Sequence, residues 1–469
     1  MGSIVVCGGG VIGLSVAAML ARDGHQVTIL EADEDGPPTA RAAWDRWERR
    51  GVAQFRQPHN VFPRFRQVCD TELPELPGRL AAAGCRWVDP LGAPEHGGML
   101  PPSLSDHEPR QGDEAFRYIT GRRPAVEAVI AAVAAEQPGV VIRRGVRVTG
   151  LVAGPPAIPG VPHVAGVRTS AGEELRGDLV VDAMGRRSPS AGLLYSLGAR
   201  PPQTRSESSG FAYYTRYFTG PSQPPMRGPV LTPLGTISIL TLYGDNGTWS
   251  VTLYTAGRDA AVKALREGSC FARVVRACPL QAHWVDGQPV TGVLPMAGIS
   301  DRYHRFVVDG VPVVTGFAAI GDAWACTNPS GGRGLTMGIV HAQLLRRTVR
   351  SYLGDPAGFA RAWDEGTEAH VTPFFRDQIS ADRLRLAEMT ALREGQPWAP
   401  PDSPMSRLAS AAAWDPVAFR AFLATVFCLA LPRDVLARPD IQDTLDRIGD
   451  KTPPPFPGPD RPRLLQLLG

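Results

Sequence analysis

The chain has 469 residues, of which 43% are hydrophobic and 20% are charged, and its formal net charge is +3. A chain of this length holds about two or three structural units with sizeable cores, and the composition is ordinary for a folded globular protein. The small net charge gives no support to binding of nucleic acid or another polyanion.

Seven cysteines are scattered along the chain, at positions 7, 69, 85, 270, 278, 326 and 428. Their odd number and the lack of a C-x-x-C pair predict neither a disulfide framework nor a metal site. The longest apolar stretch near the carboxyl end, residues 418–431, is interrupted by Arg420 and is too short to span a bilayer. No signal peptide precedes the strand expected at Ser3, so we expect a cytoplasmic protein.

The first motif lies at the amino end, where an apolar run leads into a glycine-rich turn. Residues 4–6 are Ile-Val-Val, which is typical of a buried parallel strand, and Gly8, Gly10 and Gly13 match G-x-G-x-x-G. The first glycine makes a tight turn, the second lets the backbone approach a pyrophosphate, and the third lets a helix pack on the strand.

The elements after this turn complete a dinucleotide-binding unit. A helix is expected over residues 11–22, and the unpaired N–H groups at its start, from Val11 and Ile12, favour a phosphate ligand. An apolar strand over residues 27–30 then ends at Glu31, where a carboxylate partner for a ribose hydroxyl is expected.

A second glycine-bearing motif lies far downstream, at residues 319–334. A strand over residues 311–320 is expected to deliver Asp322 to its carboxyl end. The carboxylate there can accept hydrogen bonds from the ribityl chain of a flavin, and a nicotinamide enzyme has no need of such a motif. The two motifs together therefore predict FAD as the dinucleotide.

The end of this motif suits a flat ring. Pro329 makes a rigid turn after an asparagine, and Gly332 and Gly334 let backbone N–H groups come close to the ring. A helix is expected over residues 335–350. Its positive end, at Leu335, would stabilise the negative charge of a reduced flavin.

With these motifs in this order, residues 3–350 resemble the FAD-dependent monooxygenase superfamily of p-hydroxybenzoate hydroxylase fold, which includes flavin epoxidases, halogenases and isoprenoid reductases. A third family motif resembles residues 178–188. Met184 stands where aromatic hydroxylases usually have an acid, which makes the chain more similar to the epoxidase and halogenase-like branch. The resemblance implies that Gly185 lies near the cofactor or nicotinamide; an ordinary strand-to-loop turn is the alternative.

The resemblance implies three further cofactor contacts. A comparable Arg-x-x-His stretch lies alongside the flavin in related proteins, so Arg56 and His59 are candidates, with Arg56 neutralising the pyrophosphate; a surface loop is the alternative. An arginine before a predicted helix contacts the cofactor in the family, and it matches Arg123. The strand expected over residues 140–152 would meet the adenine side, with Val148 as a backbone contact.

A different unit follows, in which aromatic and β-branched residues predict an antiparallel sheet. Residues 211–218 form one expected strand, and residues 236–243 and 248–256 flank Asp-Asn-Gly, a strong hairpin signal. Such a sheet suits a lid over the flavin ring, with the substrate between the sheet and Pro329. Alternation lets only some of the pocket candidates face inward. These candidates are Tyr213, Tyr214, Arg216 and Tyr217.

We therefore expect an α/β (α+β) protein with a Rossmann-like FAD-binding domain, an antiparallel β-sheet substrate domain and a C-terminal helical region. The expected boundaries are 1–190 and 301–350 for the two parts of the FAD-binding domain, 191–300 for the substrate domain and 351–469 for the helical region. The sequence of the helical region shows no chemistry. It is expected to cover the FAD domain, shape the substrate mouth or contact a second copy in a homodimer.

The resemblance implies an FAD-dependent monooxygenase of secondary metabolism, which transfers one oxygen atom from a flavin hydroperoxide to an aromatic or alkene small molecule. NADPH or NADH would be the reductant, acting directly or through a partner flavin reductase, and dioxygen the co-substrate. No side-chain nucleophile is required, so no catalytic residue is nominated. A reductase of an isoprenoid or polyprenyl double bond and a non-catalytic flavin-binding protein remain alternatives. A halogenase is disfavoured because no lysine precedes Lys263.

Overall fold

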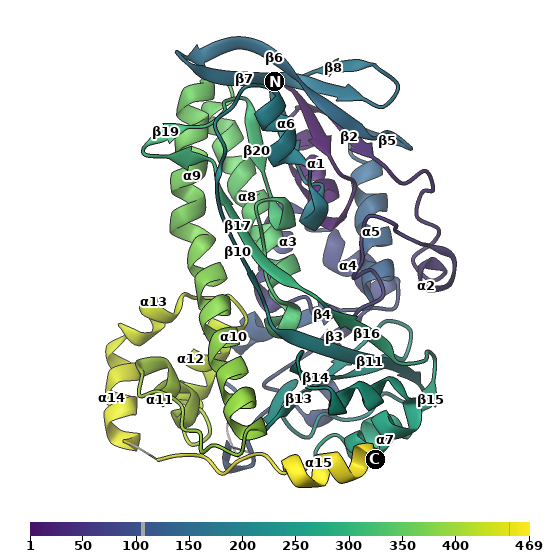
Figure 1. Cartoon of the computed structure of the whole chain (residues 1–469), viewed down its shortest axis with the longest axis vertical. Coiled ribbons are helices and arrows are strands. Elements are labelled where there is room, and N and C mark those ends of the chain that lie inside the picture. The colour runs from purple at the N-terminus through teal and green to yellow at the C-terminus, as the bar shows by residue number, and fades with distance from the viewer. Residues whose placement is uncertain (105–107, 450) are drawn as a thin grey trace.

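The computed structural model describes residues 1–104, 108–449 and 451–469. Figure 1 shows a parallel sheet in the upper half of the view and an antiparallel sheet in the lower half, with strands β10 (Gln203–Ser208) and β17 (Ser300–Arg305) running between them. Helices of the carboxyl-terminal part of the chain lie along the left side and the bottom of the view. The expected α/β (α+β) fold is confirmed.

The parallel sheet carries the first glycine motif on its central strand. Its strand order is β20-β9-β1-β2-β5, and neighbouring strands all run in the same direction. The carboxyl ends of the strands therefore lie along one edge, which is where open α/β sheets bind their ligands. The strands are β1 (Ser3–Cys7), β2 (Gln26–Glu31), β5 (Val140–Arg144), β9 (Leu179–Asp182) and β20 (Phe317–Ala319).

Helices cover this sheet, which explains why its central strand is apolar without alternation. Ile4, Val5 and Val6 are each no more than 2% exposed. Helix α1 (Val11–Ala21) packs against both α5 (Arg123–Ala135) and α8 (Gly334–Tyr352). The helix after the second motif is therefore a direct neighbour of the helix after the first.

The antiparallel sheet has the strand order β12-β13-β14-β11-β15, and β16 also pairs with β11. The predicted hairpin is confirmed, because β13 and β14 pair on either side of the Asp-Asn-Gly turn. A smaller sheet, β10-β17-β21, connects this region to the second motif. The strands are β11 (Phe211–Thr219), β12 (Leu231–Leu234), β13 (Ile237–Tyr243), β14 (Thr248–Ala256), β15 (Gln288–Pro289), β16 (Leu294–Ala297) and β21 (Ala325–Cys326).

The carboxyl-terminal part begins with two long helices, α9 (Pro356–His370) and α10 (Thr372–Arg393). Helix α9 packs on α8, and α10 reaches down to strand β14 of the antiparallel sheet. Shorter helices fill the lower left corner and the bottom of Figure 1. They are α11 (Pro404–Ala411), α12 (Pro416–Val426), α13 (Pro432–Leu436), α14 (Pro439–Ile448) and α15 (Arg461–Leu468).

The remaining elements connect and flank the two main sheets. Strands β6, β7 and β8 form an antiparallel sheet at the top of Figure 1, whereas β3 pairs with β4 and β18 with β19. These strands are β3 (Arg86–Val88), β4 (Tyr118–Thr120), β6 (Val148–Ile158), β7 (Val161–Thr169), β8 (Glu174–Arg176), β18 (Val307–Val308) and β19 (Val311–Pro312). The helices are α2 (Ala43–Arg46), α3 (Pro63–Glu72), α4 (Leu76–Ala82), α6 (Ser190–Ser196) and α7 (Gly268–Arg276).

Two predicted strands were wrong in extent. The strand expected over residues 140–152 is broken at Gly145, whose φ of +70° turns the chain, so that β5 stays in the parallel sheet and β6 joins another. The strand expected over residues 311–320 is also divided: β19 pairs with β18, and β20 joins the parallel sheet after Gly316, whose φ is +71°. A glycine turn divides each of these two stretches.

Among the residues that the structure describes, no helix combines the length and apolar character needed to cross a membrane.

One buried histidine makes the stability of the fold depend on pH. His341 of α8 is fully buried, its Nε2 lies 3.1 Å from Thr367 Oγ1, and its ring stacks on Trp363. Burial lowers the pKa of His341 to about 3, whereas a histidine of an unfolded chain titrates near 6.5. Below that pH the unfolded chain binds a proton that the folded chain does not, so stability is lost as the pH falls from 6.5 towards 3.

We predict that His341→Phe flattens this pH dependence. Between pH 6 and pH 4 the slope of the unfolding free energy against pH should fall by up to about 1.4 kcal/mol per pH unit, which corresponds to the uptake of one proton on unfolding. Denaturant unfolding followed by circular dichroism at several pH values measures the slope. His370→Gln, on the exposed part of α9, is the control. An unchanged slope in His341→Phe would contradict the prediction.

Candidate cofactor site

The first glycine turn leaves the start of α1 open. Gly8 has a φ of +108°, and a Cβ added there would lie 2.5 Å from the Ala183 carbonyl oxygen. Gly10 caps α1 in an extended conformation, no side chain caps the helix, and no acid lies in its first turn. A Cβ at Gly10 would meet no heavy atom within 4 Å. Among the described residues, the space beside Gly10 at the amino end of α1 is therefore free of protein atoms, and the N–H groups there are available to an anion.

Glu31, at the carboxyl end of β2, is held by the same turn. Its Oε2 accepts hydrogen bonds from Gly9 N at 2.8 Å and Arg49 Nη2 at 2.6 Å, and its Oε1 accepts one from Asp33 N at 2.9 Å. A carboxylate that accepts several hydrogen bonds is fixed in one orientation. The predicted ribose partner therefore lies beside the glycine turn, in a defined position.

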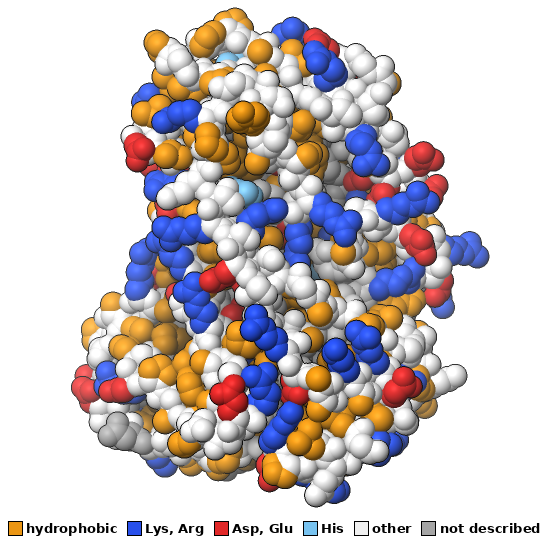
Figure 2. Space-filling model, in the orientation of Figure 1, with side chains coloured by type: hydrophobic (Ala, Val, Ile, Leu, Met, Phe, Trp, Pro, Cys, Tyr) orange, Lys and Arg blue, Asp and Glu red, His pale blue; other side chains and the backbone are white. Residues whose placement is uncertain are grey.

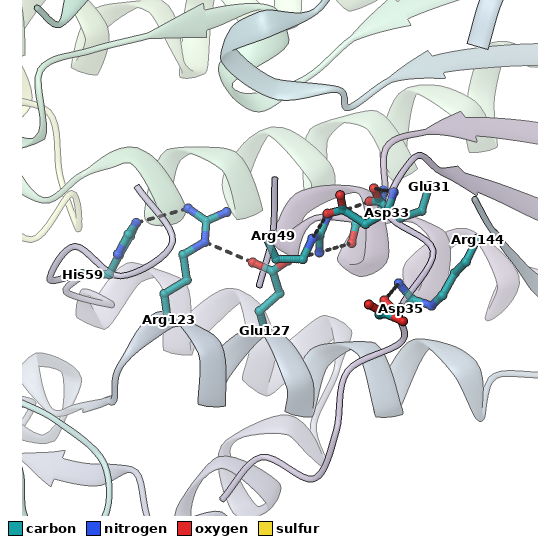
Figure 3. Close-up of polar contacts among 9 residues, drawn as sticks. Glu31, Asp33, Asp35, Arg49, His59, Arg123, Glu127 and Arg144 are labelled. Atoms are coloured by element: carbon teal, nitrogen blue, oxygen red, sulfur yellow. Dashed lines mark hydrogen bonds and ion pairs between the residues drawn. The ribbon is translucent and has the colours of Figure 1, made fainter. Parts of the chain in front are cut away.

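Arg49 lies at the centre of a buried cluster of charges, as Figure 3 shows. Its guanidinium donates to three carboxylates, those of Glu31, Asp33 and Glu127, and to the Gly9 carbonyl oxygen at 3.1 Å. Sequence reasoning missed Arg49, because the segment after β2 is rich in arginines and nothing in the sequence separates this one. Only the folded chain brings it to the glycine turn.

Glu127 of α5 joins this cluster to Arg123. It is fully buried, accepts from Arg49, and accepts from Arg123 Nε at 3.0 Å. Arg123 Nη1 lies 3.1 Å from His59 Nε2, on the left of Figure 3. The spacing of four residues between Arg123 and Glu127 is a signal that the sequence offered for this pair.

His59 is neutral in this arrangement. Burial and the nearby Arg123 guanidinium lower the pKa of His59 to about 3. Its Nδ1 lies 2.8 Å from the Gln57 carbonyl oxygen, which can only accept, so Nδ1 carries the proton and Nε2 accepts from Arg123. Arg56 lies apart from this contact: it donates to the carbonyl oxygens of Trp44 and Trp47. Its predicted contact with the pyrophosphate stays a prediction.

The second motif ends in another helix start with no cap. Asp322 follows Gly321, which has a φ of +56°, and its carboxylate is half-buried. Burial raises the pKa of Asp322, whereas Arg186, Arg123 and Arg302 act to lower it. Asp322 has no hydrogen bond to any residue that the structure describes, so its oxygens are free to accept from hydroxyl groups.

Helix α8 then begins in the same manner as α1. No side chain caps it, no acid lies in its first turn, and a Cβ at Gly334 would meet nothing within 4 Å. Leu335 is buried in its first turn, and Gly332, with a φ of +65°, ends the turn that Pro329 begins. This start of α8 is open to an anion as well.

Ile12 is where the two motifs meet. A Cβ on Gly321 would lie 3.5 Å from the Ile12 side chain, and one on Gly338 of α8 would lie 2.5 Å from it. The structure therefore brings the two glycine motifs together, although more than 300 residues separate them. An uncapped helix start from each motif and an unbonded carboxylate suit the pyrophosphate and ribityl chain of one FAD molecule.

The third motif lies close to the second. Gly185 has a φ of +74°, and the Arg186 guanidinium lies 3.5 Å from the Thr327 carbonyl oxygen. Asp182, fully buried before it, accepts from Met184 N and Ser188 Oγ and so holds the turn. Val148, by contrast, is a buried residue at the start of β6, paired with Thr169. Its contact with adenine stays a prediction.

The four pocket candidates divide between the two faces of β11. Tyr213 donates a hydrogen bond to Asn328 Oδ1 at 2.6 Å, which places its ring against the second motif. Tyr217 lies four residues further along the strand on the same face, and the centroid of its ring is 4.7 Å from that of the Trp44 ring. Tyr214 and Arg216 alternate with them and point to the opposite face, where Arg216 donates to the Thr291 carbonyl oxygen at 3.1 Å.

We predict that Glu127→Gln destabilises the fold. It removes the carboxylate that both arginines share, and a buried ion pair broken on one side costs about 3 kcal/mol. Urea unfolding followed by circular dichroism measures the loss. Glu136→Gln, which breaks an exposed pair with Arg79 at the end of the same helix, is the matched control and should leave stability unchanged. Equal effects in the two variants would contradict a special role for Glu127.

Comparisons with known proteins identify the family of the chain. A family model described as FAD dependent oxidoreductase matches residues 3–348. Protein Rv3254 of Mycobacterium tuberculosis (strain ATCC 25618 / H37Rv) is 26% identical over 436 residues, covering 89% of this chain and 88% of the relative.

Two solved structures are similar in fold. The Diels-Alderase PyrE3 from the biosynthetic pathway of pyrroindomycins has 17% identity and a TM-score of 0.58, with 91% of this chain and 80% of that chain covered. PqsL, a probable FAD-dependent monooxygenase from Pseudomonas aeruginosa, has 14% identity and a TM-score of 0.59, with coverage of 83% and 99%. The family match spans most of the sequence and both glycine motifs. The chain belongs to the FAD-dependent oxidoreductase family.

Proposed function

We propose that the protein is an FAD-dependent monooxygenase that adds one oxygen atom to an aromatic or alkene small molecule. The observation that carries the proposal is the contact of Tyr213 with Asn328. It joins an aromatic face of the antiparallel sheet to the second glycine motif, where the flavin ring is proposed to lie. A substrate between the sheet and Pro329 would therefore sit against the reactive part of the cofactor.

In this proposal the residues of the chain bind and orient. The N–H groups of Val11 and Ile12 bind the pyrophosphate, Glu31 binds the adenosine ribose, and Asp322 accepts from the ribityl hydroxyls. FAD, when bound, supplies the redox chemistry. The open start of α8, at Gly334 and Leu335, stabilises negative charge at the ring.

The proposed reaction consumes one reductant and one dioxygen molecule. NADPH or NADH gives up a hydride and, with a proton from water, supplies two electrons. One oxygen atom forms a new bond to carbon in the substrate, and the other leaves as water. The reductant acts directly or through a partner flavin reductase, and we place the protein in the cytoplasm, in secondary metabolism.

Relatives support a small-molecule substrate with an aromatic part. One structure of PqsL is a complex with 2-aminobenzoylacetate. In this chain the rings of Tyr213 and Tyr254 stack with centroids 5.2 Å apart, and the hydroxyls of Thr215 and Thr252 pair at 2.8 Å on the same face. Flat rings and buried hydroxyls on one face would suit an aromatic substrate with few polar groups.

Two alternatives are kept. PyrE3, similar in fold, is named for a Diels-Alder reaction, which needs no net electron transfer, and this favours a role for bound flavin without turnover. An FAD-dependent reductase of an isoprenoid or polyprenyl double bond would use the same cofactor motifs without oxygen.

We predict that Gly10→Val abolishes FAD binding without unfolding the protein. A Cβ at Gly10 meets no protein atom and the backbone there is extended, so valine fits the fold but fills the space proposed for the pyrophosphate. The flavin absorbance of purified protein and titration with added FAD measure binding. Gly78→Val, at an exposed and equally open position in α4, is the control. A yellow Gly10→Val protein with full flavin content would end this assignment.

We predict that turnover in ¹⁸O₂ places one labelled oxygen atom in the product. Aromatic and alkene compounds are screened by mass spectrometry with NADPH or NADH, with and without a flavin reductase. Loss of product under anaerobic conditions is expected. A saturated product formed without oxygen would favour the reductase, and the lack of any product with or without oxygen would favour the non-catalytic flavin-binding protein.

A further inference from the structure

Helix α10 buries a polar stripe. Gln378 and Asp382 are 4% and 6% exposed, and the Arg385 side chain is 12% exposed. Spacings of four and three residues place the three on one face of the helix. The opposite face is exposed and basic, with Arg376 and Arg383, and Figure 2 shows Lys and Arg side chains across the middle of this side of the molecule. The buried side of α10 also carries Phe374 and Met389, so these polar groups lie within an otherwise apolar face and call for a reason.

The stripe meets the turn of the second glycine motif, residues 328–332. Asp382 Oδ1 accepts a hydrogen bond from Ser330 Oγ at 2.5 Å, and Asp382 Oδ2 accepts from Gln378 Nε2 at 3.0 Å. A Cβ added to Gly331 would lie 2.0 Å from Gln378 Oε1. The backbone of the 328–332 turn therefore packs directly on α10, with only glycine tolerated at the contact.

The same stripe continues onto the antiparallel sheet. Arg385 Nε donates to Ser238 Oγ at 3.0 Å, and Arg385 Nη2 donates to the carbonyl oxygens of Gly235 and Ile237. The 328–332 turn is thus held from two sides, by Tyr213 of the sheet on Asn328 and by α10 on Ser330. Helix α10 joins the turn to the sheet that we propose to face the substrate.

Simple packing does not explain Asp382. Among the described residues it forms no ion pair within 4 Å; it accepts hydrogen bonds from the Ser330 hydroxyl and the Gln378 amide, and the Asn328 side chain also acts on it. Burial raises the pKa of Asp382, while the hydrogen bonds from Ser330 and Gln378 act to lower it. An unpaired buried carboxylate costs stability that an apolar residue would not cost. Its position is therefore better explained by what it holds, which is the turn.

We propose that Asp382 is a positioning residue that fixes the 328–332 turn for the flavin ring. The carboxyl-terminal part of the chain would then complete the cofactor site and not only cover it. This inference depends on the proposed placement of FAD at that turn, and not on the reaction that follows.

The test compares FAD binding in Asp382→Asn, Ser330→Ala and the double variant. Asparagine keeps the size of Asp382 but presents an N–H group towards donors, so the turn loses its fixed position. We expect a dissociation constant at least tenfold higher, measured by quenching of FAD fluorescence, and an altered visible circular dichroism spectrum of bound FAD. The double variant should bind FAD no more weakly than the weaker-binding single variant, because both substitutions remove the same contact between Ser330 and Asp382. Arg383→Gln, on the exposed face of the same turn of helix, is the control.

Each outcome decides the inference. Dissociation constants within twofold of the parent and unchanged spectra in Asp382→Asn and Ser330→Ala would overturn it, provided that Gly10→Val has lost FAD. If Gly10→Val keeps FAD, the proposed placement of the cofactor is wrong, and the inference, which depends on that placement, is wrong as well. If Asp382→Asn does not fold without FAD, Ser330→Ala decides alone, because it removes the hydroxyl and leaves α10 intact.

Discussion

The close contact between α1 and α8 is the constraint on which the rest of the structure depends. Ile12 of α1 lies so near Gly338 of α8 that any side chain at Gly338 would overlap it. This contact brings two helix starts together, each without a side-chain cap and without an acid in its first turn. Two positive helix ends at one place are unfavourable unless an anion or electron-rich ring lies between them, which is what FAD provides.

The charges around this site are arranged differently at its two ends. At the dinucleotide turn, Arg49 is enclosed by Glu31, Asp33 and Glu127, so the carboxylate of Glu31, the proposed ribose partner, is oriented by the protein itself. At the second motif, Asp322 is left without a hydrogen bond among the described residues. The charged groups at the first end therefore have partners within the protein, whereas the Asp322 carboxylate at the second end is left for the proposed ligand.

The antiparallel sheet and the carboxyl-terminal helices both contact the 328–332 turn. Tyr213 reaches Asn328 from β11, and Asp382 reaches Ser330 from α10. A rigid turn at this place matters because the orientation of a flavin ring relative to its substrate is set by backbone within van der Waals reach. The four-part division of the chain remains a proposal. Helix α10 of the proposed helical region contacts two other regions, the second glycine motif and strand β14 of the antiparallel sheet.

The sequence alone determined the local units of this protein. Gly8, Gly10 and Gly13 predicted a strand, a turn and a helix because only glycine permits that backbone, and the Asp-Asn-Gly turn predicted the hairpin for the same local reason. Alternation also predicted that the candidates of β11 would divide between two faces. Each of these signals depends only on residues that are close together in the sequence.

Only the tertiary structure decided which distant residues meet. Nothing in the sequence distinguishes Arg49 or Asp382 from the many other charged residues near them, because long-range contacts leave no local pattern. The end of β5 and the start of β20 likewise depended on the turns at Gly145 and Gly316. A buried charge is identified by the partners that folding brings to it, and those partners come from segments far apart in the chain.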